Sequence, residues 1–282
     1  MSKIIDRKEV ELTSIQKKMV KSGWGEETLE NTTVEKITYD SDGLKVKGYL
    51  AYPKGLSKKL PCVLWCRGGI GNAGAIDSFN AKGIFGQLAS WGYVVLSTQY
   101  RGNDGSEGKD EFGGDDLNDI INLKEVAKEI DIADTSIWGI EGWSRGGMMT
   151  YLTLTKDHNF NCAVVSGGIA NLRCNSDESK FMKKLYEVTM GKYGSKTFNQ
   201  KCESRSIVNF PEKLPKETPI LLMHGTADNR VLPYDSLDLA YKLQDHKIPY
   251  QLVMLKDGDH FLKSHRKEVD EMRKEWFEKF LK

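Results

Sequence analysis

The sequence predicts an α/β fold with a mostly parallel central sheet and helices on both faces. Along most of its 282 residues, short runs that are apolar throughout alternate with longer amphipathic runs. Strands that are apolar throughout are buried on both faces, which is typical of a parallel sheet covered by helices. Residues 34–55 are β-rich and contain the turn dipeptide Asp42-Gly43, so they predict a hairpin that adds antiparallel strands at one edge.

The remaining elements are predicted in chain order. Residues 1–30 are helical and amphipathic at best, and we interpret them as an N-terminal arm. After the hairpin, apolar runs predict strands at residues 60–66, 93–98, 136–142, 162–167, 218–225 and 250–256. Amphipathic runs predict helices near residues 75–91, 115–130, 145–156, 235–246 and 264–281. The pattern is that of one domain over residues 1–282.

One long segment interrupts this alternation. Roughly fifty residues separate the strand that ends at Gly167 from the strand that begins at Thr218, which is more than a usual connection. We expect residues 168–212 to form a small cap inserted over the ligand site at the carboxyl ends of the strands, with an ordinary crossover helix and a long loop as the alternative. We expect its aromatic side chains to line the entrance to that site and to set which groups enter it, unless they only pack against the sheet. These aromatics are Phe181, Tyr186, Tyr193 and Phe198.

Charge balance and apolar patterning argue against two classes of partner. The chain has 41 Lys+Arg and 40 Asp+Glu, a net charge of +1, and no basic block without acids in it. Nucleic-acid binding draws on clustered basic residues, so no nucleic-acid partner is expected. The N-terminus lacks the apolar core of a signal peptide, and no run approaches the ~18 residues of a membrane helix. We therefore expect a cytoplasmic protein with no membrane partner.

The cysteines predict neither a disulfide framework nor a zinc site. There are five of them, an odd number without a CxxC pair. We expect free and mostly buried thiols. No metal and no cofactor is expected. The cysteines are Cys62, Cys66, Cys162, Cys174 and Cys202.

A candidate nucleophile lies in the stretch Gly142-Trp143-Ser144-Arg145-Gly146, which matches G-x-S-x-G. The match follows an apolar run and opens a helical run, so it has the strand–turn–helix setting of a nucleophile elbow. A serine on so sharp a turn takes up a strained backbone conformation, and glycines on both sides avoid collisions. The turn also places the hydroxyl at a helix N-terminus, which favours negative charge. Ser144 is therefore the predicted nucleophile.

A serine hydroxyl needs a base, and the chain offers five histidines. His260 lies in a loop directly after the predicted strand 250–256, where the carboxyl end of a parallel strand meets the ligand site. His224 lies inside a strand end, where it packs or bonds locally. His158 and His246 close surface helices, and His265 is in the first turn of the last helix. His260 is the predicted base.

The base needs a carboxylate to hold its tautomer and stabilise the imidazolium. Asp228 comes directly after the predicted strand 218–225 and is the predicted acid. Asp235 is expected to cap the helix that begins there, and Asp257 and Asp259 belong to the turn before the histidine. The resulting order, serine, acid and histidine, is that of α/β-hydrolases and excludes the chymotrypsin and subtilisin orders.

The tetrahedral intermediate needs two N–H donors. One is the backbone N–H of Arg145, the residue after the nucleophile. The other is expected in the glycine-containing loop after the strand 60–66, and we choose Gly69, with Ile70 as the near alternative. Trp143, Phe181 and Tyr186 are expected to contribute to the substrate pocket.

These pieces together resemble the catalytic domain of the prolyl oligopeptidase family of serine hydrolases, and they are also similar to dienelactone-hydrolase-type esterases. The resemblance covers about residues 34–282 and is carried by YPKG, CRGGI, TQYRGNDGSEG, IEGWSRGGMM, LLMHGTADNRV and DGDHF. It implies an α/β-hydrolase fold with Ser144, Asp228 and His260 as triad. Relatives usually carry His-Gly-Gly-Pro where this chain has Arg67-Gly68-Gly69-Ile70, and often Tyr where it has Arg145.

Peptidases of that family also carry a long N-terminal β-propeller that admits only short peptides. The arm of about thirty residues cannot replace it, so we expect a catalytic domain without the propeller. The expected activity is that of a metal-free serine hydrolase acting on a small-molecule ester or a short peptide through an acyl-enzyme. A catalytically silent relative that binds small molecules is the alternative. The oligomeric state stays open.

Overall fold

The computed structural model describes residues 2–282, which divide into two compact units. The first contains the described residues of Met1–Arg67, together with Gly71–Asp110 and Asn118–Trp138. The second contains Gly68–Ile70, Glu111–Leu117 and Gly139–Lys282. The chain changes unit several times, and it passes into the second unit for the last time within strand β6 (Ala133–Trp143). The candidate site belongs to the second unit.

The first unit is built on strands in the order β1-β2-β3-β5-β4. All neighbouring pairs in this order are antiparallel except β4 and β5, which are parallel. The strands are β1 (Ile4–Glu9), β2 (Thr32–Ser41), β3 (Leu44–Pro53), β4 (Leu60–Cys66) and β5 (Val94–Thr98). The helices are α1 (Ser14–Trp24), α2 (Glu26–Glu30), α3 (Ser78–Ser90), α4 (Leu117–Ile121) and α5 (Leu123–Ala127), with a 3₁₀ turn at Gly71–Gly74.

The predicted hairpin is confirmed. Strands β2 and β3 pair antiparallel up to Ser41 and Leu44, so two residues form the turn. Both have positive φ, 54° at Asp42 and 81° at Gly43, as a type I′ turn requires. The N-terminal arm differs from expectation, because its residues 4–9 form β1 beside β2. Those residues are mostly charged and exposed, so they carry no apolar alternation that would have revealed a strand.

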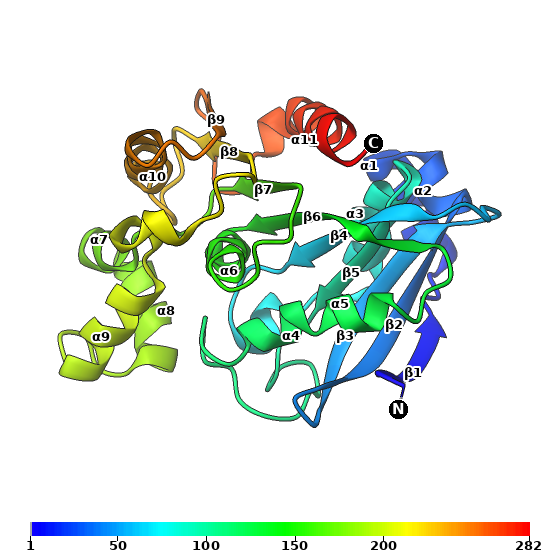
Figure 1. The fold of residues 1–282 in the computed structure, drawn as a ribbon, viewed down its shortest axis with the longest axis horizontal. Coiled ribbons are helices and arrows are strands. Elements are labelled where there is room, and N and C mark those ends of the chain that lie inside the picture. The colour runs from blue at the N-terminus through cyan, green and yellow to red at the C-terminus, as the bar shows by residue number, and fades with distance from the viewer. Residues whose placement is uncertain (1) are drawn as a thin grey trace. The chain divides into compact units, whose positions relative to one another are not determined.

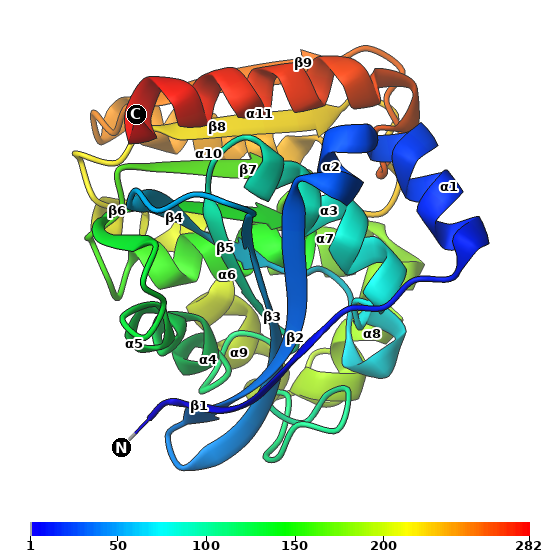
Figure 2. The ribbon, with the colours of Figure 1, turned by 90° about the vertical axis from the view of Figure 1, so that its right-hand side faces the viewer.

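The second unit holds four parallel strands in the order β6-β7-β8-β9. Besides β6 they are β7 (Cys162–Ser166), β8 (Ile220–Gly225) and β9 (Tyr250–Leu255). Helix α11 (Arg266–Leu281) lies on one face of β7 and β8, and α6 (Arg145–Leu154) lies on the other (Figure 1). Figure 2 shows α11 running along β8. Every residue of α6, β7 and β8 is buried, which makes this layer the core of the unit.

Three helices follow β7 in the segment that was expected to form a cap. They are α7 (Leu172–Glu178), α8 (Lys180–Met190) and α9 (Lys196–Arg205), and they pack against one another. Two 3₁₀ turns, Ile207–Asn209 and Pro211–Lys213, lead on to β8. Helix α10 (Tyr234–Asp245) then connects β8 to β9, and a 3₁₀ turn at Lys263–His265 precedes α11.

No helix in residues 2–282 combines the length and the apolar character that crossing a membrane requires. Four of the five cysteines are buried, and Cys174 is partly exposed.

The expectation that Asp235 caps α10 is wrong. Pro233 occupies the N-cap position and no side chain caps that helix. The buried Asp235 carboxylate instead accepts hydrogen bonds from the backbone N–H groups of Ala170 (2.5 Å) and Asn171 (2.6 Å). It also accepts one from the side chain of Asn175. Asp235 therefore anchors the start of α7 to α10, a tertiary role that helix-end statistics cannot reveal.

Burial raises the pKa of Asp235 to about 7, against hydrogen bonds that favour its ionised form. In the unfolded chain an aspartate ionises near pH ~4, so between about pH 4 and 7 the folded state binds the additional proton. The contribution of this carboxyl group to the stability of the folded state is fully present below about pH 4 and is lost as pH rises through about 7. We expect Asp235→Asn to flatten the pH dependence of the free energy of unfolding by roughly 1–3 kcal/mol between pH 5 and 8.

Urea titrations at a series of pH values measure this effect. Asp238→Asn on the exposed side of the same helix is the control, because it removes a carboxylate without touching the buried cluster. Equal slopes for wild type and Asp235→Asn would contradict the assignment.

Candidate active site

Ser144 lies at the turn between β6 and α6 in the second unit. Its backbone angles, φ 60° and ψ −121°, are far from ordinary strand or helix values, as expected for a nucleophile elbow. A Cβ atom at position 142 would collide with the carbonyl group of Gly146, so glycine is required there. The sequence G-x-S-x-G therefore folds locally into the tight turn that was predicted, and the turn leaves the serine half-buried.

The structure brings the three predicted triad residues together. The Oγ of Ser144 lies 3.1 Å from Nε2 of His260, and Nδ1 of His260 lies 2.7 Å from Oδ2 of Asp228. Each side chain follows or ends a different strand of the unit: β6, β9 and β8. With Nδ1–H donating to the carboxylate, Nε2 is left to accept the serine proton, which is the arrangement a general base requires.

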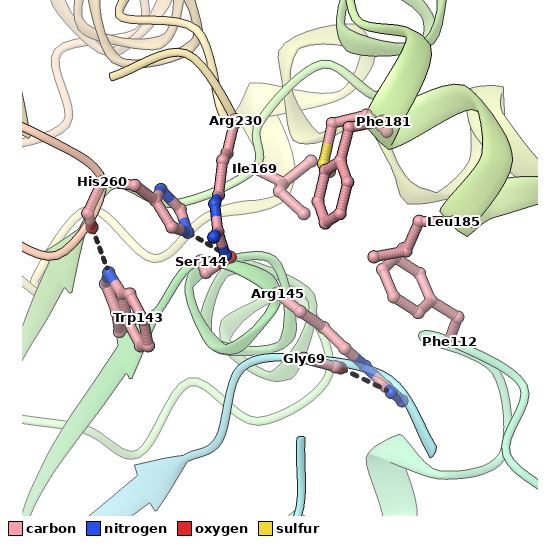
Figure 3. Close-up of a pocket in the computed structure, with 11 residues that line it drawn as sticks. Gly69, Phe112, Trp143, Ser144, Arg145, Ile169, Phe181, Leu185, Arg230 and His260 are labelled. Atoms are coloured by element: carbon pink, nitrogen blue, oxygen red, sulfur yellow. Dashed lines mark hydrogen bonds between the residues drawn. The ribbon is translucent and has the colours of Figure 1, made fainter. Parts of the chain in front are cut away.

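Backbone groups and a neighbouring ring hold the base and the acid in place. The second oxygen of Asp228 accepts hydrogen bonds from the N–H groups of Arg230 (2.9 Å) and Val231 (3.1 Å). The indole N–H of Trp143 donates to the backbone carbonyl of His260 at 3.0 Å, and the two rings lie 5.0 Å apart. Figure 3 shows Trp143 beneath the His260 loop.

A second histidine also touches the carboxylate. Nε2 of the fully buried His224 lies 3.3 Å from Oδ2 of Asp228 and 3.0 Å from the carbonyl of Val231, while Nδ1 lies 2.7 Å from Oγ of Ser236. Burial works against ionisation of Asp228, but hydrogen bonds from His224 and His260 hold the pKa of that carboxyl well below its usual range. The predicted local bonding of His224 is thus observed, and it reaches the candidate acid.

The expected oxyanion donors lie beside the serine. Arg145 is the first residue of α6, where backbone N–H groups and the helix dipole favour negative charge. Gly69 has φ +71°, a left-handed conformation that glycine adopts without strain. Its neighbour Gly68 packs so closely that a Cβ there would lie 2.9 Å from the carbonyl oxygen of Trp143.

A cavity of about 80 Å³ opens in front of Ser144, His260 and the Gly69 loop (Figure 3). Two of the three expected pocket residues, Trp143 and Phe181, line it. Its other lining residues are Phe112, Arg145, Ile169, Met182, Leu185 and Arg230. The guanidinium of Arg230 lies over the rings of Phe181 (5.4 Å) and Phe261 (4.7 Å), so a cation stands beside a mostly apolar surface.

Tyr186 does not have the role that was expected of it. It is fully buried and packs edge-on against Phe112, with ring centroids 5.6 Å apart, so it lies behind the pocket wall. Phe198 is likewise buried and packs against Tyr193 at 5.4 Å. Only Phe181 among the four aromatics lines the cavity, and it is 53% exposed.

Sequence reasoning missed several lining residues. Phe112 belongs to a loop some thirty residues before the elbow, and no local pattern connects the two. Met182 and Leu185 could have been found, because they lie beside Phe181 on one helix. Arg230 could also have been found, because it stands two residues after Asp228 at the carboxyl end of the same strand.

Comparison with known proteins identifies the family of the chain. Residues 80–282 match the model of the prolyl oligopeptidase family. The chain is 31% identical over 213 residues to an uncharacterized peptidase, YtmA, of Bacillus subtilis, covering 75% of this chain and 80% of that protein. It is 25% identical to dipeptidyl-peptidase 5 of Porphyromonas endodontalis, covering 86% of this chain and 36% of that protein.

Solved structures agree with this result at the level of the fold. The uncomplexed acylaminoacyl peptidase of Pyrococcus horikoshii superposes with a TM-score of 0.77 at 23% identity, covering 90% of this chain and 42% of that one. The predicted fold class, an α/β-hydrolase fold with helices on both faces of the sheet, is confirmed by this likeness. The chain spans less than half of the length of these larger peptidases. On the family model and the similarity to YtmA, the chain belongs to the prolyl oligopeptidase family of serine hydrolases.

Proposed function

We propose that this protein hydrolyses short peptide, amide or carboxylic ester bonds through an acyl-enzyme, with Ser144 as nucleophile, His260 as general base and Asp228 as the acid that orients the base. One observation carries the proposal: Ser144, His260 and Asp228 form a continuous hydrogen-bonded chain. Oγ of the serine lies 3.1 Å from Nε2 of the imidazole, and Nδ1 lies 2.7 Å from the carboxylate. It stands at a helix N-terminus and beside a cavity, where an acyl group can be bound.

The reaction follows from these positions. Ser144 Oγ attacks the carbonyl carbon while its proton passes to Nε2 of His260, and Asp228 stabilises the resulting imidazolium. The carbonyl oxygen becomes an oxyanion, which the N–H groups of Arg145 and Gly69 stabilise. When the tetrahedral intermediate collapses, the bond to the leaving group breaks and His260 returns the proton to the departing nitrogen or oxygen. Water then repeats the sequence and releases the acid and free Ser144.

Two observations bear on the substrate. The relatives named above are peptidases, so peptide substrates are proposed first, with esters as the chemically easier alternative. The cavity of about 80 Å³ is small, mostly apolar and flanked by Arg230. A compact apolar group on the acyl side fits this space, and the guanidinium can donate to a polar group of the substrate next to it.

We also propose that residues 168–212 act as a cap. The support is that three residues of α8, Phe181, Met182 and Leu185, line the cavity in front of Ser144. Figure 3 shows Phe181 and Leu185 reaching from this helix toward the site. Side chains at this wall would set acyl preference, while the triad supplies the chemistry.

Truncation at two aromatic positions of α8 is expected to separate a pocket role from a packing role. Phe181→Ala should change the kcat/KM ratio between long and short acyl esters by about 10- to 200-fold, because that ring lines the cavity. It should leave the shortest ester and the melting temperature almost unchanged, since the ring is 53% exposed. Tyr186→Ala should instead lower the free energy of unfolding by roughly 3–5 kcal/mol. Chain-length profiles and urea titrations of both variants measure this contrast, and an unchanged profile in Phe181→Ala would defeat the cap proposal.

A fluorophosphonate probe tests the proposed activity directly. Such probes phosphonylate an activated serine with loss of fluoride, so the wild-type protein should be labelled and Ser144→Ala should not. Aminoacyl-arylamides and p-nitrophenyl esters of graded chain length, assayed side by side, then decide between peptide and ester bonds. A wild-type protein that is folded but neither labelled nor active on any of these would reject the proposal and favour the silent binding protein.

A further inference from the structure

The side chain of Arg145 is buried beside the candidate oxyanion hole. Only 1% of the residue is exposed, although arginine is rarely buried without a specific partner. Its Nη2 lies 2.7 Å from Oδ2 of Asp116, whose side chain is fully buried. Its Nη1 donates to the carbonyl oxygen of Gly69 at 3.2 Å, and its guanidinium carbon lies 4.5 Å from the ring centroid of Phe112. Figure 3 shows this side chain reaching from the elbow to the Gly69 loop.

Asp116 is itself held by the loop that carries it. Its Oδ1 accepts hydrogen bonds from the backbone N–H groups of Gly113 (3.0 Å) and Gly114 (2.7 Å). From the other side, Arg205 at the end of α9 donates to the carbonyl oxygens of Phe112 (2.8 Å) and Glu111 (3.2 Å). The carboxylate that receives Arg145 is therefore fixed, and so is the Phe112 ring that lines the cavity.

Two successive residues of the loop that carries Gly69 are held by contacts with the elbow. Gly68 packs against the carbonyl oxygen of Trp143, and Gly69 offers its own carbonyl to the Arg145 guanidinium. The N–H of Gly69, the proposed second oxyanion donor, lies in the chain between these two contacts. Since Gly69 has φ +71° and no side chain, its backbone would have more conformational freedom without these two contacts.

We propose that the Arg145–Asp116 ion pair positions the oxyanion hole: the residue that supplies one donor also holds the carbonyl of Gly69, the residue whose N–H supplies the other. The inference rests on the proposed hydrolase function and adds to it a role for the two side chains. Arg145 and Asp116 are positioning residues in this scheme, because neither side chain touches the reacting atoms.

General electrostatics makes a merely stabilising role a poor explanation of this pair. A buried ion pair is often no better for stability than apolar side chains of similar volume, because both charges lose their hydration. Arginine, unlike lysine, presents a planar fork that can serve a carboxylate and a carbonyl at the same time. Preorganised hydrogen-bond donors contribute most to catalysis where negative charge develops in the transition state. The Arg145 guanidinium supports the backbone at that place, the proposed oxyanion hole.

The test compares two buried ion pairs of the same unit. The double variant Arg145→Met/Asp116→Leu removes the proposed device without leaving an unpaired charge. The matched control is Arg273→Met/Glu141→Leu, which removes the buried pair between α11 and β6, with Nε–Oε1 at 2.6 Å and Nη2–Oε2 at 3.0 Å. Both are assayed with the ester or arylamide that the wild type hydrolyses fastest, and with an arylboronic acid whose tetrahedral adduct on serine carries a negative charge.

We expect the Arg145→Met/Asp116→Leu variant to lose about 10²-fold in kcat and a similar factor in boronate affinity, with KM within about threefold of wild type. The control pair should keep kcat within about threefold even if its melting temperature falls. Arg145→Lys, which can pair with Asp116 but cannot also reach the carbonyl in the same fork, should lose about tenfold in kcat.

Other outcomes overturn the inference. Unchanged kcat and boronate affinity in the double variant, an equal kcat loss in the control pair, or a rise in KM alone would each reject the positioning role. If the double variant does not fold, Arg145→Lys decides, and an unchanged kcat in that variant rejects the inference. An active wild type with unaffected Arg145 variants rejects this inference alone, whereas a wild type that is neither labelled nor active rejects the proposed function and the inference with it.

Discussion

Replacing Ser144 by Ala is expected to lower kcat on the best substrate by about 10⁴-fold or more and to leave the fold intact. Its hydroxyl contacts His260 Nε2 at 3.1 Å, and the proposed acyl-enzyme cannot form without it. The strained backbone at this residue, φ 60°, is set by the turn and not by the hydroxyl, so alanine should fit the same turn. Steady-state kinetics and thermal unfolding of the variant measure both effects.

A control serine makes this result specific. Ser176→Ala removes another buried hydroxyl of the same unit, one that bonds only locally to the carbonyl of Arg173 at 2.9 Å. It should keep kcat within about threefold of wild type, because this hydroxyl bonds within its own helix and does not line the cavity. If Ser144→Ala retained turnover above a few per cent, the nucleophile would have to be another group.

The sequence made the elbow and the triad candidates predictable because the signals are local. In a parallel sheet, ligand sites form at the carboxyl ends of strands, so residues directly after apolar runs are natural candidates. Ser144, Asp228 and His260 each follow such a run. The boundaries of β4 agree with the predicted residues 60–66, and those of β7 to β9 agree to within two residues. Buried strands have a continuous apolar pattern that leaves little freedom in their limits.

Other features depend on tertiary contacts and had no local signal. The partnership of Arg145 with Asp116 joins residues 29 positions apart, and the loop that carries Asp116 has no regular pattern. The Asp235 carboxylate reaches back 65 residues to the backbone of Ala170. The predicted helix over residues 115–130 is divided into α4 and α5, a break that the amphipathic pattern did not indicate.

Helix α8 shows a signal that was present and was not used. Met182, Tyr186 and Met190 follow one another at four-residue intervals and are buried together. Phe181 and Leu185 have the same spacing, one position earlier, and both line the cavity. Residues four apart on a helix share a face, so counting in fours would have placed Tyr186 and Phe181 in different rows, although Met182 of the buried row also lines the cavity.

The second large effect is expected at His260, and its contrast with His224 makes it a sharp test. Both histidines contact Oδ2 of Asp228, at 2.7 Å for His260 and 3.3 Å for His224, but only the imidazole of His260 also reaches Ser144. His260→Gln should therefore lower kcat by about 10⁴- to 10⁶-fold, because the side-chain amide cannot take up the serine proton.

His224→Gln should behave differently, because both ring nitrogens of His224 are used for structure: one meets Ser236 and the other the carbonyl of Val231. Losing these buried contacts should lower the free energy of unfolding by roughly 1–3 kcal/mol. Since Asp228 keeps its bond to His260 and two backbone N–H groups, kcat should fall by no more than about tenfold. Kinetics and urea titrations of the two variants decide the matter. A folded His224→Gln protein that lost as much activity as His260→Gln would contradict this assignment. His224 would then be part of the catalytic machinery, and Asp228 would orient two catalytic histidines instead of one.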